Sequence, residues 1–193
     1  MTQSLRSTLT LSLAGVLIPL LLGLGFAIDA SVGAALDHQF DEGLAARVRD
    51  FATVVEREPD RYELEYDYAT IPEYTATERP SYFEIWDSTG AALARSPSLQ
   101  GVQLPRPELA IDQHIVEDYL LPDGRPGRLA ALRFIPRLDE DILPGDAHRY
   151  QDPVVIAMAH GTEDVLATHR LVRGWLLLLC GTAVGLALAG AMW

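Results

Sequence analysis

Two long uncharged apolar runs limit what this chain can fold into more than any other feature of its sequence. Leu9–Ile28 and Gly174–Trp193 are each 20 residues long and contain no Asp, Glu, Arg or Lys. A helix needs about 20 apolar residues to cross the hydrocarbon core of a bilayer. The chain is therefore predicted to cross a membrane twice, with transmembrane helices at residues 9–29 and 171–193.

The segment between these two runs carries nearly all of the charge. Every acidic residue except Asp29 and every arginine except Arg6 and Arg173 lies in residues 30–170, and the chain has a formal net charge of −12. An acidic segment repels nucleic acid and anionic surfaces, whereas small cations, cationic peptides or a positively charged protein face suit it. Residues 30–170 are therefore predicted to form one domain that does not bind nucleic acid.

Few charges decide how the chain is oriented in the membrane. Arg6 precedes the first run and the acidic domain follows it, so the positive-inside rule places residues 1–8 in the cytoplasm and the domain outside it. Arg170 and Arg173, beside the second run, oppose this assignment. The first run has a second interpretation as a cleaved signal peptide, because a positive residue precedes it.

The apolar pattern after the first run favours an uncleaved helix that continues into the domain. Side chains at i, i+4, i+7 and i+11 share one helix face, and here these positions hold Leu44, Val48, Phe51 and Val55. Pro59 is predicted to end this helix. The acidic stretch Glu56–Asp67 is predicted to be a solvated connector or a cation site, and Thr70–Pro80 a loop.

Strand patterns fill the rest of the domain. Tyr82–Leu99 alternates around a polar turn, which is typical of a β-hairpin. A second hairpin is predicted at His114–Leu138, with Arg128–Leu138 as one long strand. Val154–Ala159 is continuously apolar, which predicts a central strand covered on both faces. Beyond it, a helix is predicted to continue to the end of the chain.

Both hairpins carry a family resemblance. The words YFEIWDSTGAALARSPSL in the first hairpin, and LPDGRPGR and LRFIPRLDED in the second, resemble the N-terminal extracytoplasmic sensor region of bacterial two-component sensor histidine kinases. The resemblance implies a periplasmic sensor domain between two helices of the bacterial inner membrane. It also implies a homodimer that signals to a cognate response regulator through a cytoplasmic kinase.

The expected fold class is α+β. A small antiparallel sheet, built from the two hairpins and the Val154 strand, is expected to pack on the long helix in the manner of PAS-like sensors. Two transmembrane helices flank this domain, and only they are expected to contact membrane lipid. The lone cysteine, Cys180, lies in the second run and is expected to behave as a small apolar group.

The sequence holds no catalytic constellation that we can assign. It has no Gly-x-Ser-x-Gly motif and no phosphate-binding Gly-x-x-x-x-Gly-Lys motif. Its histidines are not spaced as a zinc motif; they are His38, His114, His148, His160 and His169. No cofactor is therefore expected in this chain, and the resemblance implies ATP only for a kinase core beyond it.

One candidate site is a cation site in an acidic loop. Hard and borderline cations bind carboxylate oxygens and imidazole together, and the candidate ligands are Asp139, Glu140, Asp141, Asp146 and His148. The alternative is an ordinary solvated loop. The resemblance adds little here, because the Glu-x-x-Glu motif of iron-sensing relatives is absent.

A second candidate site is for an anion. Arg95, Arg133 and Arg137 are predicted to bind a small carboxylate bidentately if their strands are neighbours, and some of the resembling sensors detect tricarboxylates. Trp86 is predicted to line the pocket. The alternatives are surface pairing of these arginines with Glu84 or Glu117, and plain core packing of Trp86.

Two classes of function follow. The first is the input module of a sensor histidine kinase, which detects an extracytoplasmic signal and passes it through the second membrane helix to a kinase not contained in this chain. The alternative is a stand-alone bitopic binding or scaffold protein without kinase output. An anchored secreted enzyme is disfavoured by the absence of catalytic motifs.

Overall fold

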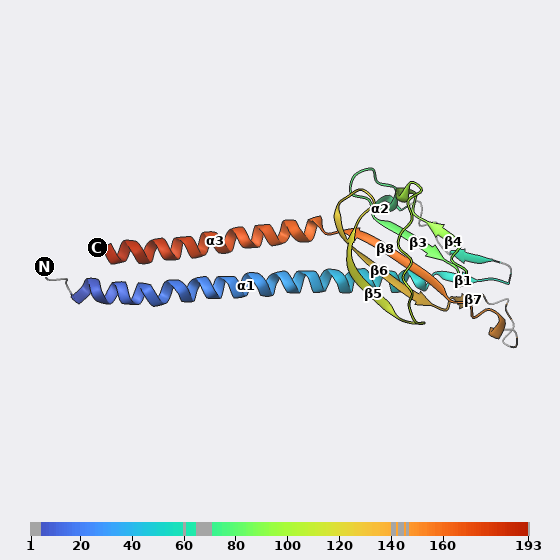
Figure 1. The fold of residues 1–193 in the computed structure, drawn as a ribbon, viewed down its shortest axis with the longest axis horizontal. Coiled ribbons are helices and arrows are strands. Elements are labelled where there is room, and N and C mark those ends of the chain that lie inside the picture. Colours follow the sequence, from blue (N-terminus) through green and yellow to red (C-terminus); the bar gives the residue numbers. More distant parts are fainter. Residues whose placement is uncertain are drawn as a thin grey trace. The chain divides into compact units, whose positions relative to one another are not determined.

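The computed structural model describes residues 5–59, 61–64, 71–139, 142, 145 and 147–192 (Figure 1). They fall into two compact units, one formed by the sequence up to His38 together with that from Asp164, and the other by Gln39–Glu163. The elements are α1 (Leu5–Ala52), β1 (Val55–Arg57), β2 (Tyr62–Leu64), α2 (Pro72–Thr75), β3 (Tyr82–Trp86), β4 (Ala92–Arg95), β5 (His114–Leu120), β6 (Pro126–Phe134), β7 (Arg137–Leu138), β8 (Val154–Gly161) and α3 (Glu163–Met192). The predicted α+β class with a long apolar N-terminal helix is thus confirmed.

The last strand in the sequence, β8, lies in the middle of the larger sheet. Its order is β4-β3-β8-β6-β5, and all of its neighbours are antiparallel (Figure 1). Both predicted hairpins are present, as β3–β4 and β5–β6. Residues Val154–Ala159 of β8 are all buried, because strands pair with β8 on each side and side chains cover each face. The prediction of a central strand is therefore confirmed.

Each face of this sheet packs against a different part of the chain. Leu44, Val48 and Phe51 of α1 cover the face that carries Phe83 and Ile85. The opposite face is covered by the loop after β4, through residues that include Leu99, Leu104 and Leu109. Burial on both faces explains why every residue of β3 is buried.

α1 ends earlier than the sequence predicts, at Ala52 rather than at Pro59. The Thr53 and Val54 N–H groups bond back to carbonyls three residues before them, which tightens the last turn into a stop. The β-branched Val54 and Val55 then favour a strand. Val55 is fully buried as predicted, but in β1 rather than on a helix.

The acidic stretch after α1 forms part of a second sheet, so its described residues are more than a connector. This sheet has the order β2-β1-β7, with β1 antiparallel to β2 and parallel to β7. Residues 60 and 65–70 of the region lie outside the described part of the chain. Between them and β3, the predicted loop contains the short helix α2, which buries Tyr74.

The predicted strand Arg128–Leu138 is two strands in two different sheets. β6 ends at Phe134, and β7 begins at Arg137 in the sheet of β1. Pro136 lies between them and has no N–H to donate, so a ladder cannot continue through it. The prediction of one long strand at Arg128–Leu138 was therefore wrong.

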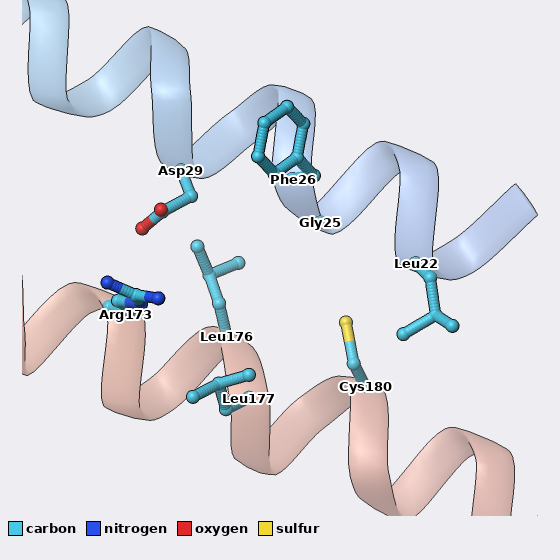
Figure 2. Close-up of a pocket in the computed structure, with 8 residues that line it drawn as sticks. All are labelled: Leu22, Gly25, Phe26, Asp29, Arg173, Leu176, Leu177 and Cys180. Carbon is cyan, nitrogen blue, oxygen red and sulfur yellow. The ribbon is translucent and has the colours of Figure 1, made fainter. Parts of the chain in front are cut away.

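The unit that contains α3 is an antiparallel helix pair. Asp29 Oδ1 lies 3.4 Å from His169 Nε2, and a Cβ on Gly25 would lie 3.0 Å from Cys180 Sγ. Figure 2 shows the residues between the two helices, with Asp29 and Arg173 facing one another. Cys180 is half-buried here, beside Leu22 and Gly25.

One helix among the described residues is long and apolar enough to cross a membrane, the part of α1 at Gly15–Ala52. It is compatible with a membrane anchor or with a signal sequence. The prediction of two spans is therefore supported at the first run only. α3 forms a helix over Glu163–Met192, but its role as a second span stays a prediction.

The turn of the first hairpin is held by Asp87. Its carboxylate accepts hydrogen bonds from the Thr89 N–H, the Thr89 hydroxyl and the Ala91 N–H, at 2.7 to 2.9 Å. Burial acts to raise the pKa of Asp87, but these hydrogen bonds outweigh it and lower the pKa below its ordinary value. Gly90 completes the turn at φ 92°, a conformation that favours glycine.

Asp87→Ala is expected to lower the free energy of unfolding at pH 7 by about 1 kcal/mol, through loss of these hydrogen bonds. Because the folded-state pKa is depressed, the contribution is complete above the ordinary pKa of an aspartate and is lost as the pH falls through the folded value. Urea unfolding at pH 7 and near pH 2 measures this difference. Asp87→Asn is the control: it keeps one neutral acceptor oxygen, so it should lose the pH dependence together with the part of the pH 7 stability that comes from the charge.

Candidate functional site

The three arginines predicted to share an anion do not meet. Arg95 lies on the edge strand β4, Arg133 lies on β6, and β3 and β8 separate them. Arg137 lies opposite Glu56 in the smaller sheet. The break at Pro136 removes Arg137 from the strand of Arg133, so the predicted set of three is wrong as a single site.

Arg95 pairs with a buried carboxylate. Its Nη2 lies 3.2 Å from Oε1 of Glu84, whose side chain is 0% exposed, while that of Arg95 is 40% exposed. The contact is an ion pair without hydrogen-bond geometry. The other Glu84 oxygen accepts a 2.9 Å hydrogen bond from the Leu104 N–H. Arg95 thus neutralises a charge beneath the sheet, which is the pairing that the sequence offers as the alternative to ligand binding.

Trp86 lies in the core on the same face of the sheet as Arg133. The register aligns Trp86 with Val155 and Val155 with Arg133 across β3, β8 and β6. Trp86 is 4% exposed and belongs to the cluster that includes Leu99 and Leu104. Its indole therefore packs beneath the loop after β4 and does not line the cavity near Arg133.

Arg133 instead shares a cavity with Arg106. The cavity measures about 440 Å³, and its lining is Ser88, Arg106, Pro107, Glu108, Leu109, Arg133 and Val155. Arg133 Nη1 donates a 2.8 Å hydrogen bond to the Leu109 carbonyl, and Arg106 Nη2 donates a 3.1 Å bond to the Asp87 carbonyl. These bonds fix both guanidinium groups against backbone and leave further N–H donors on each.

The lining determines which ligands the cavity can hold. The lining includes two arginines and one carboxylate residue, Glu108, so the cavity has an excess of positive charge in an otherwise acidic protein. Guanidinium forks match the geometry of carboxylate oxygens. Leu109 and Val155 add an apolar wall. Chemically, the cavity suits a small anion that carries carboxylate groups.

Arg106 was missed at the level of the sequence. It stands between Pro105 and Pro107, which fix the backbone on both sides of it. The one sequence feature that could have indicated a binding role for Arg106 is its position as a single arginine in a proline-rich loop. Nothing in the local pattern places this loop over the end of β6, because that approach depends on tertiary packing.

The predicted cation loop is described only in part. Glu140, Asp141 and Asp146 lie outside the described residues. The His148 ring Nδ1 is 3.0 Å from the Gly145 carbonyl oxygen, and the Asp139 N–H donates to the Arg57 carbonyl. Among the described residues no three His, Cys, Asp or Glu side chains are grouped to hold a metal. The cation site therefore stays a prediction.

Arg125 joins three segments where the sheet passes into α3. Its Nη1 donates to Glu163 Oε1 at 2.8 Å, its Nε donates to Asp123 Oδ2 at 2.6 Å, and its Nη2 donates to the Pro80 carbonyl at 2.9 Å. Burial acts to raise the pKa of Asp123, but bonds from Arg125 outweigh it and lower that pKa. The turn between β5 and β6 is thus tied to the first residue of α3.

Comparison with protein-family models, with curated proteins and with solved structures finds no match to this chain.

Proposed function

We propose that this chain is the input module of a membrane-bound two-component sensor histidine kinase. In this proposal, the domain between the two apolar runs detects an extracytoplasmic signal and passes it through α3 to a cytoplasmic kinase. The sequences of the two hairpins, Tyr82–Leu99 and His114–Leu138, support the proposal because they resemble those of sensor kinases. The proposal also includes a PAS-like fold, a homodimer and a periplasmic domain at the bacterial inner membrane.

The observation that carries this proposal is the continuity of the sheet with α3. Thr162 alone separates the end of β8 from the first residue of α3. Arg125 reinforces that junction through Glu163. A ligand that favours one packing of the sheet would bias the position of α3, and a ligand without such a preference would transmit nothing.

Uncharged apolar residues support a second membrane span in α3. Gly174–Trp193 contains no charged side chain over the length that a bilayer core requires. Arg173 directly precedes this run and would lie at the membrane interface. In the proposed dimer, four spans would form a bundle in which α3 shifts relative to α1.

The cavity of Arg106 and Arg133 is the proposed ligand site. Removal of either guanidinium, as Arg106→Gln or Arg133→Gln, is expected to weaken citrate binding about tenfold, because a charge-assisted bidentate contact is lost. Isothermal titration calorimetry of the full chain in detergent micelles measures this. Arg61→Gln removes an arginine paired with Glu58 outside the cavity and should leave affinity unchanged.

Equal citrate binding by all three variants would contradict this assignment of the ligand site. It would leave the proposed signalling role to be judged by the next experiment.

The coding DNA beyond the Trp193 codon distinguishes the two classes of function. The proposal predicts an open frame that encodes a helical linker, a histidine-bearing dimerisation helix and an ATP site. A stop codon there would contradict it. That outcome would favour the alternative of a bitopic binding or scaffold protein, whose output comes through a partner.

A further inference from the structure

A second cavity lies on the opposite face of the larger sheet, where α1 ends. It measures about 580 Å³, which is large enough for a small organic molecule. Residues of α1, α2 and β8 line it, and those that determine its chemistry are Arg47, Asp50, Phe51, Glu73, Tyr74 and Met158. None of them lines the cavity of Arg106 and Arg133.

The floor of this cavity is formed by packed aromatic side chains. Tyr74 packs edge-on against Phe83 with ring centroids 4.8 Å apart, and Phe51 lies 5.1 Å from Phe83 and 6.4 Å from Tyr74. Phe51, Tyr74 and Met158 are all less than a tenth exposed. Little of each ring is therefore exposed, and the half-buried Val54 and Ile71 complete the apolar surface that a ligand would meet.

The rim of the cavity is negatively charged. Arg47 Nη1 lies 3.6 Å from Glu73 Oε2, but both side chains are well exposed, so this ion pair is weak. Within the described part of the chain, the Asp50 carboxylate has neither an ion pair nor a hydrogen bond.

We propose that this cavity binds an organic cation, in which an ammonium group is attached to an apolar or aromatic body. The ammonium lies beside Asp50 and Glu73, and the apolar body lies on Val54 and Ile71, above the buried rings of Phe51 and Tyr74. Two carboxylates against one arginine give the rim a net negative charge, which disfavours an anion. A bare metal ion would gain nothing from the aromatic floor. The site is separate from the anion cavity in both place and charge.

Titration of the full chain in detergent micelles with phenethylammonium tests this proposal. Asp50→Asn and Glu73→Gln are each expected to weaken binding about fivefold, the effect of removing one partly exposed charge. Arg47→Gln is expected to tighten binding about threefold, because it removes a competing cation and frees Glu73. Glu117→Gln is the matched control, an exposed carboxylate on β5 outside the cavity.

The sign of the Arg47→Gln effect separates a cation site from an anion site. Weaker binding of phenethylammonium by this variant would overturn the proposal. Equal affinity of the unsubstituted chain for 3-phenylpropionate, which has a similar body and the opposite charge, would also overturn it. The same would follow if Asp50→Asn, Glu73→Gln and the control Glu117→Gln all bound phenethylammonium with the same affinity. Unchanged near-ultraviolet circular dichroism verifies that each variant is folded. No kinase output enters the measurement, so the result is independent of the proposed signalling function.

Discussion

Trp86→Ala is expected to lower the free energy of unfolding by about 3 to 5 kcal/mol, the usual cost of truncating a large aromatic side chain in a core. The indole is almost fully buried and packs with Leu99 and Leu104 beneath the loop after β4. The cost therefore combines lost apolar burial with a cavity.

Differential scanning calorimetry of the full chain in micelles measures the Trp86 effect. Trp175→Ala is the matched control, because its side chain is 61% exposed in α3 and outside the sheet domain. The domain transition should move only in the Trp86 variant. Unchanged stability together with altered ligand response would instead assign Trp86 to the ligand site.

Arg95→Ala is expected to lower the free energy of unfolding by about 3 kcal/mol, because it leaves the Glu84 carboxylate buried without its cation. Arg95 is partly exposed, which places the effect at the low end for a broken buried pair. Glu84 is otherwise bonded to the Leu104 N–H, so its own removal would also disturb the loop.

A double variant separates this effect from the loss of the arginine side chain itself. Glu84→Gln with Arg95→Ala removes both charges but keeps an acceptor for the Leu104 N–H, and should regain most of the stability. Urea unfolding of the single and double variants measures the coupling. If Arg95→Ala lost citrate binding but kept its stability, the structural role of Arg95 as the partner of Glu84 would be contradicted.

The sequence predicts those parts of the fold that depend on local pattern. The hairpin at Tyr82–Arg95 has alternating side chains and a turn whose Asp87 and Gly90 have specific backbone roles. The continuous apolar run of β8 matches a strand buried on both faces. The stripe of Leu44, Val48 and Phe51 is buried as its spacing predicts.

The parts that could not be predicted depend on contacts between distant segments. β1 is a strand because β2 and β7 pair with it. The acidic composition of this region does not predict a strand. The cavity of Arg106 and Arg133 forms because the packing of a loop brings Arg106 beside Arg133. Arg137 is separated from Arg133 because Pro136, which has no N–H, ends the ladder between β6 and β7.

The proposed sensor role requires the acidic domain to lie on the outer side of the cytoplasmic membrane. The most direct test uses a single-cysteine variant, Cys180→Ser with Val102→Cys, because Val102 is 48% exposed on a loop of the domain. Cells that produce this chain are treated with a membrane-impermeant maleimide before and after lysis. We predict equal labelling of intact and lysed cells. Labelling that occurs only after lysis would place the domain in the cytoplasm and contradict the account.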